Sequence, residues 1–430
     1  SDMSAWVLMG LPASIYLSGM GQTWIAIGLG IGYAVSWIFM APRLRRFSIA
    51  AGDSITIPQY LTNRFLSKNK SLQILSAIIF LVAYTIYAAS SIKACGTLFN
   101  TVMDIDPTVA MYIAAFIIVA YTFLGGFSAV CWTDFFQGMI MLAALLIAPL
   151  FALALAKAGD GAATGAALPD GFFNFFTTPQ DIISGLGWGL GYFGMPHIII
   201  RFMSLKSEKE LRKSSVIGIS WTTIILIMSA LTAIAGRLYL GEIEDSSTVF
   251  ITMVRRIFPA LVSGLLLSAI LSAAMSTADS QLLAASSAFA SDVYKPVIRK
   301  KASDSEMLWA GRIVVIVIAV VALMIASDPN SGSIMGLVEN AWGVFGAAFG
   351  PVILLSLFWK RLTFGGTVAG IAAGAAVDIL WLVFLSSTDI YEIVPGFAAG
   401  LLAAVVVSLL SKGPGKDVED LFDRAVDLKS

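Results

Sequence analysis

Long apolar stretches alternate with short polar stretches along most of this 430-residue chain. With a window of about 19 residues, which is the length that spans a bilayer as a helix, the pattern predicts membrane-spanning segments. Twelve such segments lie at 4–19, 22–42, 72–99, 108–124, 129–156, 184–203, 214–240, 259–291, 307–326, 334–358, 363–385 and 392–411. The chain is therefore predicted to be an all-α integral membrane protein of the lipid bilayer. It begins so close to the first segment that we expect an N-terminally truncated helix there.

The sixth segment carries an unusual number of residues that disfavour a helix. Between Gly185 and Pro196 it contains five glycines and one proline. Glycine is entropically costly in a helix, and proline removes a backbone donor. A broken span is tolerated in a membrane only where protein or a watery cavity surrounds the freed backbone groups. The segment is therefore predicted to be a discontinuous span that forms a binding site.

A second interruption is indicated at the start of the first segment, where polar residues precede the apolar run. Paired discontinuous spans in corresponding positions are typical of transporters built from inverted repeats, which bind their solutes near the middle of the membrane. The two interrupted segments together favour such an architecture.

Charge is scarce and unevenly placed. Charged residues make up 13% of the chain and hydrophobic residues 58%, and the formal net charge is zero. This balance gives no indication of nucleic-acid binding. Of the 27 lysines and arginines, 21 lie in one set of alternate loops and in the C-terminal tail, whereas the opposite loops hold mostly acids. The positive-inside rule places the basic set, and with it the C-terminus, in the cytoplasm.

Metal chemistry of the histidine or cysteine type is not indicated. The chain has one histidine, and Cys95 and Cys131 show neither metal-type spacing nor a disulfide framework. No cofactor is predicted.

Hydroxyl groups line one face of the eighth segment. Ala273, Ser276, Thr277 and Ser280 are spaced by three and four residues, which places them on one side of a helix. Hydroxyls and free carbonyls suit sodium, because a bare alkali ion needs several oxygens at short range. Alternatively, these hydroxyls bond back to a carbonyl one turn earlier or join neighbouring helices.

Aromatic residues mark one face of the sixth segment. Trp188, Tyr192 and Pro196 recur every four residues, so on an α-helix they would stay within about 80° of arc. Such a face would form one wall of a pocket for a compact apolar ring that bears a carboxylate and an ammonium group. The alternative is an interfacial belt or ordinary packing.

Three acids lie in or beside predicted spans. Asp2 is the acid nearest the first interruption, and a carboxylate in a span is a functional candidate by default, unless it is solvated and idle. Asp134 begins the fifth segment, where it could contact the cation or, together with Thr133, cap a helix. Asp279 lies one turn from Ser276 and would either add charge to the ion path or bond a neighbouring hydroxyl.

Four motifs carry a resemblance to a known family. They are Ser1-Asp-Met-Ser4, Tyr121-Thr-Phe-Leu-Gly-Gly-Phe127 with Trp132-Thr-Asp134, Trp188-Gly-Leu-Gly-Tyr-Phe-Gly-Met-Pro-His197, and Ala274-Met-Ser-Thr-Ala-Asp-Ser-Gln-Leu-Leu283. The chain resembles the sodium/solute symporter family from residue 1 to about residue 411. Relative to that family we expect a further N-terminal helix and the first half of the first core helix to be missing.

The resemblance implies a leucine-transporter-like core of two inverted five-helix units with accessory helices. A single transport domain would cover 1–411, with the truncated first repeat at 1–157, the second repeat at 184–358, accessory helices at 359–411 and a cytoplasmic tail at 412–430. The implied activity is sodium-coupled symport of L-proline into the cell across a bacterial inner membrane. The protein would be a transporter and no enzyme, with sodium as its coupling ion.

The resemblance also assigns roles to individual residues. Sodium would be bound by Met3, Ala273, Ser276 and Thr277, with Asp2, Ser4 and Asp134 tuning sodium affinity or coupling. Proline would be bound by Tyr87, Trp188, Tyr192 and Pro196. Three alternatives stay open: symport of another small solute such as an amino acid, a sugar or a carboxylate, a solute-sensing membrane module, and a channel that conducts without coupling.

Overall fold

The computed structural model describes residues 3–124, 127–159, 168, 170–205 and 208–428. All regular secondary structure in this part of the chain is helical. The first half contains η1 (Ala5–Val7), α1 (Gly10–Ser18), η2 (Met20–Gln22), α2 (Thr23–Val35), η3 (Ser36–Met40), α3 (Ala41–Ala50), α4 (Ile57–Arg64), α5 (Ser71–Met103), α6 (Pro107–Leu124), α7 (Phe127–Lys157), α8 (Pro179–Gly187), η4 (Trp188–Phe193) and α9 (Pro196–Met203). The second half contains α10 (Glu208–Leu240), η5 (Ser246–Thr248), α11 (Val249–Ile257), α12 (Ala260–Ala288), η6 (Phe289–Ile298), α13 (Asp304–Ser327), α14 (Ile334–Phe358), α15 (Phe364–Phe384), η7 (Ser386–Thr388), α16 (Ile393–Leu410) and α17 (Lys416–Asp427).

The predicted segments correspond closely to these helices. Within the described residues, nine helical stretches are long and apolar enough to cross a membrane. Two of the remaining predicted segments are shorter apolar helices, Ala5–Ser18 and Pro107–Ala120. The twelfth is the glycine-rich segment, which is divided among α8, η4 and α9. The hydrophobic pattern therefore located the spans correctly, and the segment richest in glycine is divided among three short helices.

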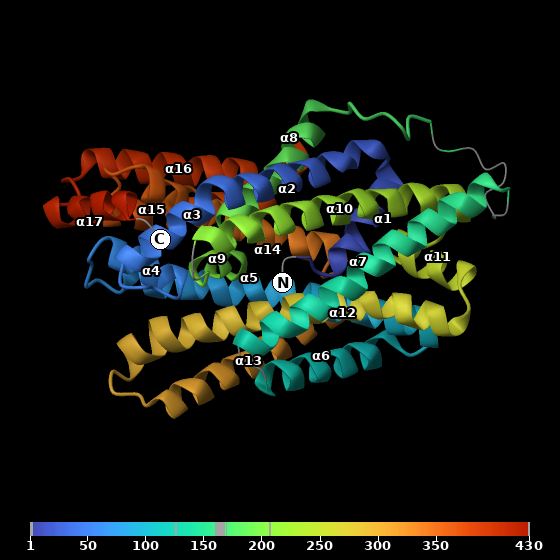
Figure 1. Ribbon diagram of the computed structural model, residues 1–430, viewed down its shortest axis with the longest axis horizontal. Helices are drawn as coiled ribbons and strands as arrows, with labels where there is room; N and C mark the ends of the chain where they lie inside the picture. The colour runs from blue at the N-terminus through green and yellow to red at the C-terminus, as the bar shows by residue number, and fades with distance from the viewer. Residues whose placement is uncertain (1–2, 125–126, 160–167, 169, 206–207, 429–430) are drawn as a thin grey trace.

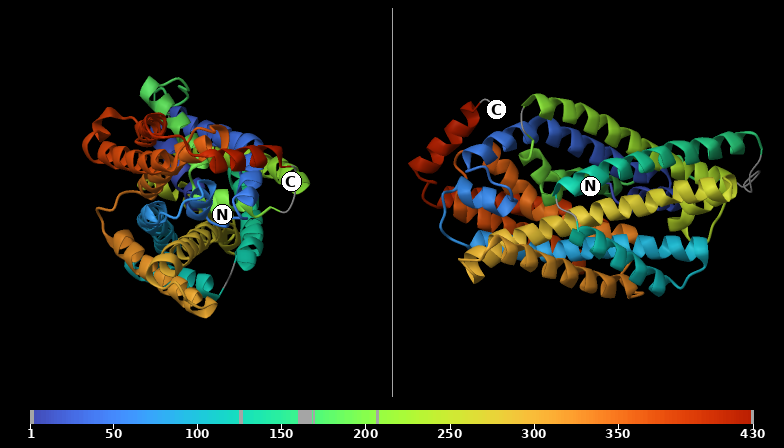
Figure 2. Two further views of the ribbon diagram at one scale, coloured as in Figure 1. Left: turned by 90° about the vertical axis from the view of Figure 1, so that its left-hand side faces the viewer. Right: turned by 60° about the horizontal axis from the view of Figure 1, so that its bottom comes forward.

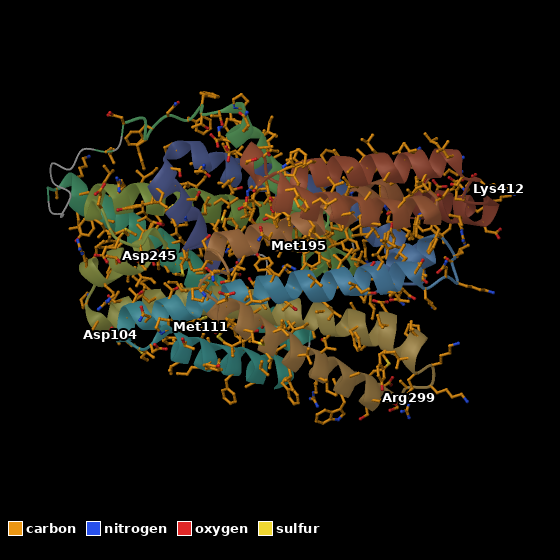
Figure 3. The ribbon with its side chains drawn as sticks, turned by 180° about the vertical axis from the view of Figure 1, so that it is seen from behind. Asp104, Met111, Met195, Asp245, Arg299 and Lys412 are labelled. Atoms are coloured by element: carbon orange, nitrogen blue, oxygen red, sulfur yellow. The ribbon has the colours of Figure 1, made fainter. Side chains whose placement is uncertain are left out.

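The helices run along the long axis of an elongated bundle (Figure 1). Helices α6 and α13 pack on one flank against α5, whereas α15 and α16 pack against α14. The loops with opposite charge lie at opposite ends: Asp104 and Asp245 are at one end, and Arg299 and Lys412 are at the other (Figure 3). We refer to these as the acidic end and the basic end. The alternation of acidic and basic loops expected from the sequence is thus present in the fold.

Glycines bring α2 into backbone contact with the broken span. A Cβ atom at Gly28 would collide with the carbonyl oxygen of Gly185, and one at Gly32 would collide with that of Gly189. On each side the two glycines are four residues apart, Gly28 and Gly32 on α2 and Gly185 and Gly189 on the broken span. Small residues at this spacing let helices in membranes approach closely. The close approach fixes α8 and η4 against α2, so the glycines serve the packing of the broken span as well as its break.

The C-terminal tail is ordered as an amphipathic helix. Helix α17 lies across the basic end of the bundle and contacts α3 and α4 (Figure 2). The Phe422 ring packs edge-on against Phe47 at 5.1 Å and lies 5.0 Å from the guanidinium carbon of the buried Arg64. Outside this core, Asp423 accepts a hydrogen bond from Lys360, which raises the pKa of that lysine.

Replacing Phe422 by alanine should release α17. A buried phenylalanine contributes about 3–5 kcal/mol relative to alanine, and a helix of 12 residues is marginal in water without tertiary packing. We expect trypsin to cleave the folded Phe422→Ala variant at Arg424 several-fold faster than it cleaves the folded wild type. The exposed Asp420→Ala serves as the matched control, and equal cleavage of the two variants would contradict the docking role of Phe422.

Candidate functional site

The predicted break in the sixth segment is present. Helix α8 ends at Gly187, the chain continues as the tighter 3-10 helix η4, and Met195 has an extended backbone (φ −74°, ψ 109°). Helix α9 then begins at Pro196, where a residue without an N–H suits the first helical turn. Met195 lies near the middle of the bundle, between the acidic and the basic end (Figure 3). The first span is also irregular, because η1 precedes α1 there.

One geometric expectation was wrong. Trp188, Tyr192 and Pro196 do not share one face of an α-helix, because η4 winds with about three residues per turn and the extended Met195 separates it from α9. As a result, Trp188 borders a cavity at the acidic end, whereas Pro196 borders a different cavity at the basic end. The membership of these residues in a substrate site stays a prediction.

The cavity at the acidic end, which we call the outer cavity, has a volume of about 560 Å³. Its wall combines aromatic rings with carboxylates: Trp188, Trp381, Tyr391, Asp181, Glu339, Asp389 and Glu392. Aromatic faces and carboxylates both attract cations. The outer cavity is therefore suited to admit an ion or a solute that carries an ammonium group.

The cavity at the basic end, which we call the inner cavity, has a volume of about 400 Å³. Pro196 and Ile200 of α9 line it opposite Leu283 of α12. Arg45 and Asp53 also line it, and they form an ion pair at 2.9 Å. The inner cavity thus reaches the end of the broken span from the side opposite to the outer cavity.

Aromatic side chains pack around η4 between these cavities. The Tyr192 ring is fully buried and meets Tyr33 and Trp342 edge-on, each at 5.1 Å between ring centroids. The Trp188 ring lies between Trp6, at 6.0 Å, and Tyr391, at 5.1 Å. We call these six residues the aromatic layer. The layer thus packs around the part of the broken span between Trp188, which borders the outer cavity, and Pro196, which borders the inner cavity.

Helix α5 faces the other side of the break. The Tyr84 hydroxyl accepts a hydrogen bond from the backbone N–H of His197 at 3.0 Å, which satisfies a first-turn donor of α9. Tyr87 is three residues further along the same helix and is fully buried. Residues three apart lie on one face of a helix, so Tyr87 is on the side of α5 that meets the broken span. Its predicted role as the opposite wall remains a prediction.

The hydroxyl-bearing face of α12 is buried and contacts η1, with Thr277 fully inside the protein. Ser276 donates to the Ala273 carbonyl at 3.2 Å, so that hydroxyl does bond back by one turn. Thr277 Oγ1 and Ser4 Oγ are buried and have no hydrogen-bond partner among the described residues. Buried oxygens with unused lone pairs are the donors that an alkali ion requires, and the two belong to packed elements. Sodium binding at these residues stays a prediction.

A small cavity of about 240 Å³ brings three of the predicted residues together. Met3, Ser276 and Asp134 all line it, although they come from the chain start, α12 and α7. Asp2 lies outside the described residues.

Asp134 does not cap a helix. Helix α7 begins at Phe127, so Asp134 lies beyond its first turn, and the capping interpretation was wrong. Instead, its carboxylate accepts a hydrogen bond from Arg201 of α9 at 2.9 Å. Arg201 also donates to Ser280 Oγ of α12 at 2.8 Å. The ion pair thus joins the broken span to the two helices that carry the predicted sodium-site residues.

Asp279 is fully buried beside this ion pair. Its Oδ1 lies 3.4 Å from Ser280 Oγ, as expected for a bond to a neighbouring hydroxyl, and its Oδ2 has no partner among the described residues.

Some residues of the site were not predicted from the sequence. They are Arg201, which lies beside Asp279, and four members of the aromatic layer: Trp6, Tyr33, Trp342 and Tyr391. Gly346, one turn after Trp342, was the available signal, since a Cβ atom there would lie 2.9 Å from the Cα atom of Gly191 in η4.

Membrane-length helices with a broken span, reached by separate cavities from opposite ends, define a solute transporter of the membrane. Residues 1–374 match the model of the sodium:solute symporter family, and the chain belongs to this family. The chain is 44% identical over 437 residues to the high-affinity proline transporter PutP of Bacillus subtilis, covering 100% of this chain and 92% of that protein. It is also 44% identical over 444 residues to the sodium/proline symporter of Haemophilus influenzae, covering 99% of this chain and 88% of that protein.

Two solved structures share the fold. The first is the substrate-bound, outward-open state of a Na+-coupled sialic acid symporter, with a TM-score of 0.76 and 20% identity over 96% of this chain and 88% of that one. The second is Mhp1, a nucleobase-cation-symport-1 family transporter in a closed conformation, with a TM-score of 0.58 and 15% identity over 98% of this chain and 93% of that one. The predicted leucine-transporter-like fold is thereby confirmed.

Proposed function

We propose that this protein is a symporter that imports L-proline together with sodium by alternating access. The observation that carries the proposal is the broken span, whose two ends border different cavities, with buried aromatic rings packed around η4 between them. The choice of proline is supported by the identity of 41–44% to proteins named as proline transporters or sodium/proline symporters.

In this proposal sodium binds between the chain start and α12. The ligands are the backbone at Met3 and Ala273 and the hydroxyls of Ser276 and Thr277, while the nearby Ser4, Asp2 and Asp134 tune affinity or coupling. The unused oxygens of Thr277 and Ser4 support this assignment. Because η1 contacts α12 and continues into the aromatic layer through Trp6, an ion held there stabilises the same region that surrounds the solute.

Proline binds in the middle of the broken span, between Trp188, Tyr192, Pro196 and Tyr87. It enters from the outer cavity, where carboxylates attract its ammonium group, and leaves through the inner cavity beyond Pro196. Passage requires the rings of the aromatic layer to separate on one side at a time. No covalent step is needed, since binding and rearrangement move the solute.

The topology follows from the charges at the two ends. We place the basic end, including α17 and the C-terminus, in the cytoplasm of a bacterial cell, because basic loops are retained on that side. The transport domain covers 1–411, with the repeats at 1–157 and 184–358 and accessory helices at 359–411. Residues 412–430 form the cytoplasmic tail.

Uptake by the purified protein in proteoliposomes tests the proposed function. Labelled proline should accumulate under an inward sodium gradient and should fail to accumulate when the gradient is absent. An excess of unlabelled proline should abolish the signal, whereas a sugar or a carboxylate should leave it unchanged. Accumulation that sodium does not affect, or that another solute suppresses more strongly than proline, would contradict the proposal.

Asp134→Asn should raise the sodium concentration for half-maximal uptake several-fold. The substitution keeps the shape but removes the charge beside the cavity that Met3 and Ser276 also line. The double variant Asp134→Asn with Arg201→Gln separates two explanations, because it also removes the half-buried positive charge that Asp134 no longer neutralises in the single variant. We expect sodium dependence to stay impaired in the double variant. A double variant whose sodium dependence equals that of the wild type would show that Asp134 serves only as the partner of Arg201.

A further inference from the structure

One tryptophan of α14 contacts both predicted substrate residues of η4. The Trp342 indole N–H donates a hydrogen bond of 2.8 Å to the backbone carbonyl of Trp188, and the side chain is almost fully buried. Trp188 is the residue at which α-helical winding changes to 3-10 winding, where backbone hydrogen bonds have poorer geometry. The indole therefore stabilises a carbonyl at the break itself.

The same indole ring orients Tyr192. The two rings meet at 85° with centroids 5.1 Å apart, which is the edge-on geometry that aromatic pairs prefer. On its other side Tyr192 meets Tyr33 at 77°. Tyr192 is thus held between a ring from α14 and a ring from α2, and its direction depends on both.

The backbone of η4 is shaped to this indole. A Cβ atom added at Gly191 would find its three nearest neighbours within the Trp342 ring, all closer than an atom can pack. Gly191 lies between Trp188 and Tyr192 in sequence, so the chain passes directly over the indole at this point. The contact is possible only because the residue is glycine.

We propose that Trp342 is a positioning residue for the solute, which sets the directions of Trp188 and Tyr192 from α14. This inference rests on the proposed function. With the carbonyl of one residue bonded and the ring of the other packed edge-on, both aromatic residues keep fixed directions relative to α14. Without the indole N–H, η4 loses its hydrogen bond to α14 at Trp188, while the aromatic layer keeps most of its bulk.

The variant Trp342→Phe tests this role, because phenylalanine keeps a ring and removes the N–H. The expected result is a rise of about tenfold in the proline concentration for half-maximal uptake, as for one lost buried hydrogen bond, with a maximal rate within about twofold of the wild type. Discrimination against the four-membered ring of azetidine-2-carboxylate should also weaken. If Trp342 had only a structural role, its replacement would lower the maximal rate of uptake and leave the discrimination against azetidine-2-carboxylate unchanged.

Trp24→Phe is the matched control. The Trp24 indole also donates to a backbone carbonyl, that of Phe175 at 3.0 Å, and packs against the Phe175 ring at 4.8 Å, but it does so beside an outer loop. The proline concentration for half-maximal uptake by Trp24→Phe should equal that of the wild type. An unchanged value in Trp342→Phe, or an equal rise in both variants, would overturn the positioning role.

Amide hydrogen exchange without any solute provides a second measurement. Exchange in the segment Trp188–Met195 should be at least several-fold faster in Trp342→Phe than in the wild type, and unchanged in Trp24→Phe. Equal exchange in all three proteins would overturn the inference whatever the solute is. Failure of the wild type to take up proline with sodium would instead overturn the proposed function, and the exchange result would still decide whether Trp342 anchors η4.

Discussion

Replacing Thr277 by valine should raise the sodium concentration needed for half-maximal proline uptake at least tenfold. Valine preserves the volume of threonine and removes its oxygen, which is buried and has no hydrogen-bond partner among the described residues. A contact between an oxygen and a charged group contributes about 1.5–3 kcal/mol, which corresponds to about a 10- to 150-fold change in affinity. Initial rates of proline uptake into proteoliposomes, measured over a range of sodium concentrations, give this value directly.

Two companion variants make the result specific. Thr277→Ser keeps the hydroxyl and should keep most of the sodium affinity. Ser268→Ala removes a half-buried hydroxyl from the same helix, one that bonds back to the Leu265 carbonyl, and this variant should match the wild type. A sodium dependence in Thr277→Val equal to that of Ser268→Ala would remove Thr277 from the ion site.

Replacing Gly194 by alanine should lower the transport rate at least tenfold and reduce the thermal midpoint of the purified protein. Gly194 follows η4, and an added Cβ atom would lie 2.8 Å from the backbone nitrogen of Gly350 and 2.9 Å from the Cα atom of Gly346 on α14. Backbone atoms in a packed helix cannot move aside as a flexible side chain can. Overpacking of this kind costs about 1–3 kcal/mol, and it acts at the point where α14 meets the broken span.

Gly264→Ala is the control for this prediction. Gly264 lies in α12, and an added Cβ atom there would meet nothing within 4 Å. Alanine favours a helix by about 1 kcal/mol over glycine, so this variant should be as stable as the wild type or slightly more stable. Equal transport rates and thermal midpoints in Gly194→Ala and Gly264→Ala would show that the close contact with α14 has no functional consequence.

The two cavities explain how one broken span can serve a solute that crosses the membrane. Trp188 borders the outer cavity and Pro196 the inner cavity, while Tyr192 is enclosed between them. A rearrangement of η4 relative to α14 would therefore change access on both sides at once. The Trp342 contact with the Trp188 carbonyl lies at this junction of η4 with α14.

The span positions, the separation of charge between the two ends and the break between Gly185 and Pro196 could all be predicted from the sequence. Each depends on composition within a short window: apolar length matches membrane thickness, basic loops remain on one side, and glycine with proline interrupts a helix. The shared face of Ala273, Ser276, Thr277 and Ser280 was also expected, since residues spaced by three and four share one side of a helix, and the structure buries all four.

Only the tertiary structure decided which residues meet. The shift to 3-10 winding placed Trp188 and Pro196 on different cavities, although their spacing predicted a shared face. The pairing of Asp134 with Arg201 and the bond from Trp342 to η4 join residues that are 67 and 154 positions apart. Local sequence patterns determine how a segment winds and whether it enters the membrane. Contacts over such separations depend on how the helices pack against one another, which no single segment encodes.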